Sequence, residues 1–268
     1  MNRLNVCRAA SSVLLLSVIV GCGSEDSTSQ GENCFNSDVW RDGVHEATWL
    51  IEGVESGHPY SYTLTLTEEF RSGQYFNGYH NLISKELIGY EISEDRVIDE
   101  PVRSFYSYLS VDKDNGRVLA VGSQEFEGEE VERWSDYSPA AFYLRHDLSV
   151  GDVDSQQSFL VERSHGSDRE YHSDIQESFI NNGLEKLSIG DKNLRSCHFS
   201  HDSHTYRYLE DGSFAEDYIN HKNYWLDEQT GLMVQMTIEQ EGKDLRESDS
   251  IYEHSKLQSY YVDGNRIF

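Results

Sequence analysis

Basic residues are scarce in this sequence: 22 Lys and Arg stand against 48 Asp and Glu, which gives a formal net charge of −26 at pH 7. A protein that binds nucleic acid needs clustered Lys and Arg to contact the phosphates, and a protein held flat on anionic lipid by electrostatics needs them too. The composition therefore argues against both kinds of partner. The acids are spread along the chain, which is typical of a solubilising surface, with loose capture of cations as the alternative.

A hydrophobic run long enough to span a membrane is also missing. The uncharged stretch at residues 9–20 contains 12 residues, whereas a membrane-spanning helix needs about 20. Arg3 and Arg8 precede this stretch and the small residue Gly21 follows it. A positive flank, a short apolar core and a small residue together predict a secretory signal peptide at residues 1–21.

The residues Ile19-Val20-Gly21-Cys22 resemble the lipobox of bacterial lipoproteins. The resemblance implies cleavage before Cys22 and attachment of acyl chains, palmitate among them, to this cysteine. Two or more chains anchor a protein stably to a membrane. Gly23 rather than Asp follows the cysteine, which in Gram-negative bacteria favours the outer membrane. We expect residues 22–36 to be the lipidated cysteine and a flexible tether, because residues 23–32 contain no large apolar side chain.

Cysteine is rare, with 4 residues in the chain. Cys7 leaves with the signal peptide and Cys22 carries lipid, so Cys34 and Cys197 remain. An exported protein folds in an oxidising compartment, and we therefore expect a disulfide between these two; two free thiols are the alternative. The chain-entropy estimate for so long a loop is about 5 kcal/mol, as an upper figure. No CxxC spacing supports a metal role for the pair.

Helical periodicity is weak, whereas strand signals dominate. Residues 60–67 and 232–239 alternate between apolar and polar side chains, and turn signals containing Gly separate such stretches. We expect residues 37–268 to form an all-β domain: a large curved antiparallel sheet, as a half-barrel or a sandwich, with few short helices. The best helix candidates are residues 78–88 and 173–180.

Internal sequence similarity suggests that this domain contains two related β-meanders. Residues 111–121 and 226–236 share an aliphatic residue, Asp, three residues, Gly and an apolar strand. The possible halves are residues 37–150 and 151–268. Two ordinary hairpins with the same turn chemistry are the alternative.

The second half also carries a family resemblance. A strand with Cys197, a strand with Tyr224-Trp225 and the turn Gly231-Leu232 are together similar to a pattern found in uncharacterised exported bacterial β domains. A more remote likeness is to lipoprotein carriers, whose half-barrel is a curved antiparallel sheet that holds an acyl chain. These resemblances imply a fold rather than a chemistry.

One unusual cluster of histidines follows Cys197. His198, His201 and His204, with Asp202 among them, could ligate zinc or copper. On a continuous strand His198 and His204 share one face and His201 points to the other, so a turn would be needed to bring the three together. A polar hairpin tip with solvated imidazoles is the alternative.

Motifs for catalysis are missing. The chain has no GxSxG elbow, and the neighbours His201-Asp202-Ser203 do not make a triad, whose members meet through the fold. The turn at residues 112–116 begins like a calcium loop but lacks the closing Glu, because position 123 is Ser. Trp40, Trp49 and several tyrosines could line a groove, but their expected place is the core of the sheet.

These observations favour a non-enzymatic, lipid-anchored envelope protein with a binding or structural role and no cofactor. Its expected partners are the membrane, through the lipid anchor, and an apolar ligand in a β groove or another envelope protein. A metal-binding module that uses the three histidines is the alternative, and a hydrolase acting on envelope polymers is a further one.

Overall fold

The computed structural model describes residues 34–93, 104–127, 130–165, 170–209, 211–243 and 248–268. The predicted signal peptide, Cys22 and most of the predicted tether lie outside these residues. The strands are β1 (Gly43–Glu55), β2 (His58–Phe76), β3 (Tyr79–Ser93), β4 (Ser104–Asp112), β5 (Arg117–Glu127), β6 (Glu130–Arg145), β7 (Val153–Ser164), β8 (Glu170–Ile189), β9 (Lys192–Leu209), β10 (Phe214–Asp227), β11 (Met233–Lys243), β12 (Ser248–Val262) and β13 (Asn265–Arg266).

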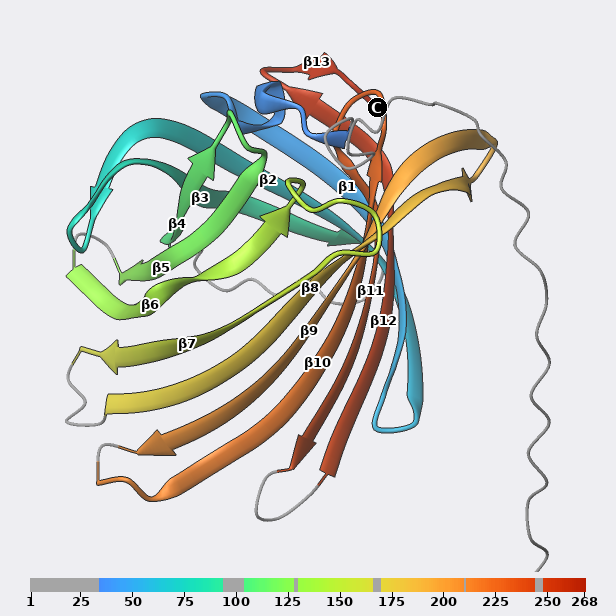
Figure 1. The fold of residues 1–268 in the computed structure, drawn as a ribbon. Helices are drawn as coiled ribbons and strands as arrows, with labels where there is room; N and C mark the ends of the chain where they lie inside the picture. The colour runs from blue at the N-terminus through green and yellow to red at the C-terminus, as the bar shows by residue number, and fades with distance from the viewer. Residues whose placement is uncertain (1–33, 94–103, 128–129, 166–169, 210, 244–247) are drawn as a thin grey trace, which may run out of the picture.

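The strands form one antiparallel sheet that closes on itself. Each strand pairs with the next in sequence, and β1 also pairs with β12, from His45 opposite Val262 to Glu55 opposite Ile251. The short β13 adds to β12 beside the closed ring. The result is a barrel made of β1 to β12 (Figure 1). The predicted all-β, curved antiparallel sheet is confirmed, and closure leaves neither β1 nor β12 as an open edge.

The two predicted helices are wrong. Residues 78–88 begin in the turn after β2 and continue into β3, and residues 173–180 lie within β8. In β8, Ser173, Ile175 and Phe179 are buried, and residue 176 between them is exposed. This period of two is that of a strand with one face inward. The only helix that lies wholly within the described residues is the 3-10 turn η2 (Ser37–Trp40). In the described part of the chain, no helical segment has the length and hydropathy of a membrane span.

Residues 34–40, called the strap below, lie across one end of the barrel. The ring of Phe35 packs edge-on against His146 in the β6–β7 connection, 5.1 Å between centroids. The side-chain amide of Asn36 donates to the carbonyl oxygen of Thr230 in the β10–β11 turn, at 3.0 Å. Trp40 enters the barrel and packs against Phe70. The strap therefore joins turns that are far apart in the sequence.

Apolar side chains fill the barrel near the strap and form a second cluster next to the first. The inner cluster includes Phe70, Leu144, Phe179, Phe199 and Leu226. A second cluster brings residues of the β8–β9 hairpin against β11 and β12; its members include Leu187, Ile189, Leu194, Val234, Leu257 and Phe268. The long strands β8 and β9 thus bury apolar surface through their hairpin end as well as through the barrel wall.

The two hairpins with similar sequences, at residues 111–121 and 226–236, have the same turn chemistry. The backbone N–H of Asn115 donates to the side chain of Asp112 at 3.2 Å, and that of Thr230 donates to Asp227 at 2.9 Å. The glycine that follows has a positive φ in both, +65° in the first and +69° in the second. The proposed halves at residues 37–150 and 151–268 contain β1–β6 and β7–β12. Their common origin stays a prediction.

The sheet is incomplete at the junction of these halves. Residues 133–138 of β6 pair with residues 159–164 of β7, and the pairing then stops, although both strands continue. Pro139 follows the last pair, and proline has no N–H to donate to a neighbouring strand. The unpaired part of the β6–β7 contact is called the seam below.

Candidate ligand cavity

A cavity of about 460 Å³ lies inside the barrel. The alternation of β2 sends Leu64, Leu66, Glu68 and Phe70 to the interior, where all four line the cavity. The other walls come from the strap, β1, β3, β6, β10, β11 and β12, and include Val39, Trp40, Ala47, Trp49, Ile51, Lys85, Tyr143, Leu144, Lys222, Tyr224, Leu226, Met233, Met236, Ile238, Glu253 and Tyr260. The size is in the range of small-molecule sites, and the walls are mostly apolar.

Trp40 and Trp49 lie in this wall, so their place is partly core and partly cavity surface.

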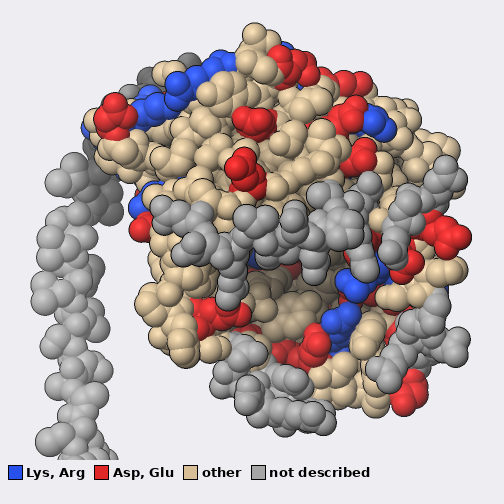
Figure 2. Space-filling view, turned by 180° about the vertical axis from the view of Figure 1, so that it is seen from behind, with Lys and Arg blue, Asp and Glu red and all other residues tan. Residues whose placement is uncertain are grey.

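The surface of the molecule is hollowed on one face, where acidic and basic side chains lie beside the hollow (Figure 2). Acidic side chains are scattered elsewhere on this face, as the sequence led us to expect for a solubilising surface.

Two lysines project into the cavity, and the sequence analysis identified neither. The ammonium of Lys85 lies 2.9 Å from the carboxylate of Glu68. Burial opposes this charge, but Tyr143 and Glu68 outweigh burial, so the pKa of Lys85 lies above its ordinary value. The pair is therefore a neutralised group within the apolar wall.

Lys222 is in a different situation. Burial lowers the pKa of its ammonium below the ordinary value, and the more distant charge of Glu177 opposes that effect only in part. Lys222 makes no ion pair or hydrogen bond with any residue that the structure describes. Lys222 is partly buried, and its ammonium lines the cavity without a partner among the described residues, which makes it a candidate for contact with a ligand.

The inward face of β10 changes from polar to apolar along the strand. Tyr218 and Asn220 come first, Lys222 follows, and Tyr224 and Leu226 come last, next to the strap. The neighbouring strand β9 shows the same change, since His201 and Thr205 are buried farther from the strap than Phe199. Along β9 and β10 the interior is thus apolar toward the strap and polar toward the other end, with Lys222 at the boundary.

Glu177 of β8 is the centre of the polar part. Its carboxylate accepts hydrogen bonds from the side chains of Gln156 at 2.6 Å, Ser158 at 3.0 Å and His201 at 3.0 Å, and from the backbone N–H of Phe142 at 3.2 Å. Gln156 also donates to the carbonyl oxygen of Ala140 at 3.0 Å. These side chains take the place of the missing ladder hydrogen bonds across the seam. Nearer the strap, Arg145 pairs with Asp154 across the same seam.

The three histidines predicted to bind metal are not brought together. β9 runs without interruption through all three, paired residue by residue with β10, so the turn needed to regroup them is absent. His201 points inward to Glu177, whereas His198 stacks on Trp225 and His204 binds Asp217 at 2.6 Å. Among the described residues, no group of three His, Cys, Asp or Glu could hold a metal ion. The predicted metal site is therefore wrong for these residues.

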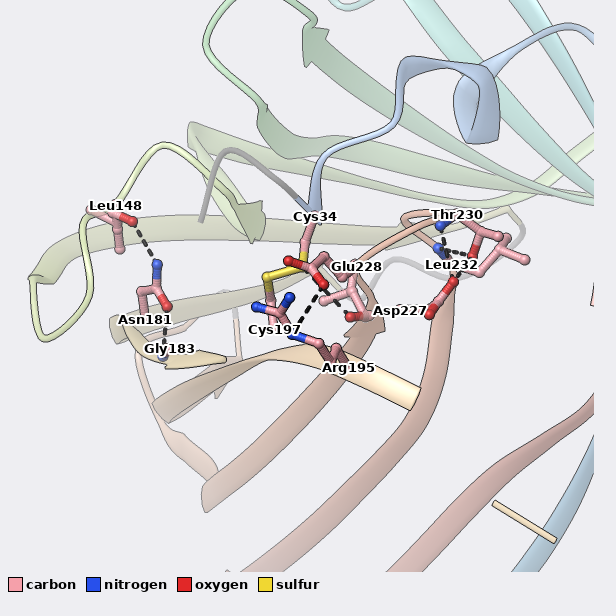
Figure 3. Close-up of a disulfide and its surroundings, with 11 residues drawn as sticks. Cys34, Leu148, Asn181, Gly183, Arg195, Cys197, Asp227, Glu228, Thr230 and Leu232 are labelled. Atoms are coloured by element: carbon pink, nitrogen blue, oxygen red, sulfur yellow. Dashed lines mark hydrogen bonds and ion pairs between the residues drawn. A yellow bond between two sulfur atoms is a disulfide. The ribbon is translucent and has the colours of Figure 1, made fainter. Parts of the chain in front are cut away.

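The predicted disulfide between Cys34 and Cys197 is confirmed. It joins the strap to β9, with 6.1 Å between the two Cα atoms, and both side chains are fully buried (Figure 3). Beside it Asn181 donates to the carbonyl oxygen of Leu148 at 2.7 Å. Cys34 and Asn36 contact the barrel, so the predicted tether of residues 22–36 extends too far into the folded part.

Comparisons with known proteins identify no family for this chain. No protein-family model matches, and no curated protein matches either. Among solved structures, the chain is similar to a hypothetical lipoprotein, YmcC, from Escherichia coli K12, with 11% identity and a TM-score of 0.32, over 80% of this chain and 87% of that chain. The TM-score is too low for this likeness to support an argument about fold or function.

Proposed function

We propose that the protein is a lipid-anchored envelope protein that holds an apolar ligand inside its barrel. The cavity carries this proposal. Protein interiors pack like organic crystals and have few voids larger than a water molecule. An apolar space of about 460 Å³ within a closed barrel departs from that rule, and its size and lining suit a small apolar molecule.

Under this proposal the barrel works next to a membrane. Cys22 carries the acyl chains, residues 23–33 connect it to the strap, and the outer membrane is the favoured location. Two or more acyl chains provide stable attachment. The barrel would then bind its ligand, or support another envelope protein, without a catalytic step or a cofactor.

Ligand binding is tested on the full-length chain carrying Cys22→Ser, so that no attached acyl chain competes for the cavity. A series of 1-alkanols is measured by displacement of an apolar fluorescent dye. Each buried methylene contributes about 0.8 kcal/mol, so the affinity should rise about fourfold per carbon until the cavity is full. An affinity that does not depend on chain length would contradict the proposal.

Two substitutions on β11 show whether the ligand occupies the cavity. Met236 lines the cavity, and Met236→Trp should fill part of it and shorten the longest alkanol that still gains affinity. Glu239 is exposed on the other face of the same strand, so Glu239→Trp serves as the matched control and should leave the series unchanged. Equal effects of the two variants would place the ligand elsewhere.

The anchor is tested separately, by intact mass spectrometry of the unmodified protein extracted from membranes. The expected mass is that of a chain beginning at Cys22 plus its acyl groups. A chain that keeps Met1 and carries no acyl group would remove the membrane part of the proposal, whatever the result for the cavity.

A further inference from the structure

We infer that the ligand is a long-chain carboxylate of the fatty-acid type, and that the ammonium of Lys222 is the counter-ion of its head group. This inference rests on the proposed function, because it concerns the same cavity. It adds the charge of the ligand and the direction in which the ligand lies.

The first argument is the state of the charged side chains in the cavity wall. There are four of them, Glu68, Lys85, Lys222 and Glu253. Lys85 and Glu68 neutralise each other at 2.9 Å. Glu253 accepts hydrogen bonds from Ser255 at 3.0 Å and from Tyr60 at 3.3 Å. Within the described chain, Lys222 is the only one of the four without a hydrogen-bond or ion-pair partner.

The second argument concerns Glu177, the acid that acts on Lys222 from a distance. Glu177 already accepts hydrogen bonds from Gln156, Ser158, His201 and the backbone of Phe142. Four donors occupy its two oxygens, so it is held in the seam and does not serve as a direct partner for Lys222. An acidic group in the cavity would supply the missing partner, and charge-assisted hydrogen bonds to a carboxylate are strong ones.

The third argument is the polarity of the interior. Lys222 lies where the polar part of the inward face of β10 meets the apolar part that ends at Leu226 near the strap. A molecule with an acidic head at Lys222 and an apolar chain toward Trp40 would match both parts. A neutral apolar ligand would leave the ammonium unpaired beside it, at a cost in free energy.

The test compares dodecanoate with 1-dodecanol, which have the same chain length and differ in the head group. Both are measured by dye displacement on the full-length Cys22→Ser chain. Lys222→Met should weaken dodecanoate binding by about thirtyfold or more, the usual effect of truncating one partner of a buried charge pair. The same variant should leave dodecanol binding unchanged or stronger.

Two further variants exclude an indirect effect. Lys222→Arg keeps the positive charge and should retain most of the affinity for dodecanoate. Lys113 is exposed in the β4–β5 turn, so Lys113→Met removes one positive charge from the protein without touching the cavity. Lys113→Met should leave the affinity for both ligands unchanged. Circular dichroism should show the same strand content in all variants.

The outcomes separate this inference from the proposed function. If Lys222→Met weakens the binding of both ligands equally, or of neither, the inference is overturned and the cavity remains an apolar site. If neither ligand binds the parent chain, the proposed function fails as well. Dodecyl phosphate forms the third arm, and tighter binding of the phosphate than of the carboxylate at Lys222 would overturn the assignment of a carboxylate head.

Discussion

The carboxylate of Glu177 in β8 accepts the backbone N–H of Phe142 in β6, with 3.2 Å from the amide nitrogen to each carboxylate oxygen. These two strands are not neighbours in the sheet, because β7 lies between them. The contact exists because β6 and β7 separate after Ser138, so the amide of Phe142 has no partner in β7, although Phe142 stays paired with Leu119 of β5 on the other side. A side chain thus completes the hydrogen bonding of the barrel wall at the seam.

Glu177→Ala should lower the free energy of unfolding by about 3 kcal/mol or more. The substitution leaves buried donors of Gln156, Ser158, His201 and Phe142 without their acceptor, and each such group costs about 1–3 kcal/mol before any relaxation. Urea denaturation measures the change. Gln176→Ala, on the exposed outer face of the same strand, is the control and should change stability by less than about 0.5 kcal/mol. A similar small loss for both variants would show that the seam does not depend on Glu177.

The disulfide should stabilise the strap and with it the whole barrel. Cys34 and Cys197 are 163 residues apart, and replacing both with Ala should lower the free energy of unfolding by about 3–5 kcal/mol. Urea denaturation of the double variant is compared with that of the parent chain, each with and without a reductant. The reductant should destabilise the parent chain to the level of the variant and leave the variant unchanged. A loss of less than about 1 kcal/mol would contradict the estimate.

Local patterns in the sequence predicted much of the fold because strands leave a signal of period two. The same rule correctly separated His201 from His198 and His204, and the turn invoked to regroup them is absent from β9. The pairing of Cys34 with Cys197 followed from counting cysteines. Closure of the barrel did not follow, because it depends on β1 meeting β12, over 200 residues away.

The cavity was harder to predict, because its polar residues break the pattern that identifies strands. Lys85 and Lys222 stand at inward positions where an apolar side chain is expected, and Glu177 does the same in β8. Residues 173–180 were consequently interpreted as a helix. All three side chains could have been recognised in the sequence as charged residues at strand positions where the alternation predicts an apolar side chain.

His146 should make the protein less stable in mild acid. Burial lowers the pKa of its imidazole to about 4, partly opposed by Asp147, and its Nδ1 has no hydrogen-bond partner among the described residues. An unfolded histidine titrates near 6.5, so between these values the unfolded chain binds a proton that the folded chain does not. The contribution of the neutral His146 to the free energy of unfolding is therefore present in full above about pH 6.5 and is lost as the pH falls toward about 4. The difference between the two pKa values corresponds to about 3 kcal/mol.

The variant His146→Phe, which keeps an aromatic ring between Phe35 and Phe199, isolates this effect. Acidic side chains make both proteins less stable at low pH, so the comparison is the difference between them. The parent chain should lose more stability than the variant between about pH 7 and about pH 4.5, as measured by urea denaturation. Parallel losses would mean that the folded and unfolded chains bind a proton at residue 146 equally well, so that burial does not lower the pKa of His146.

The tryptophans should report where the ligand lies. The chain has 4 of them, and Trp40 and Trp49 line the cavity. Trp225 stacks on His198, which lies on the opposite face of β9 from the inward-pointing His201. Trp134 lies under the guanidinium of Arg163. A fatty acid brominated along its chain quenches tryptophan emission only on close contact, so it should quench the two cavity tryptophans. The double variant Trp134→Phe/Trp225→Phe should keep most of the quenching, and Trp40→Phe/Trp49→Phe should lose it. The reverse result would move the ligand from the interior to the outer face of the barrel, because the apolar chain would then contact the tryptophans that lie away from the cavity.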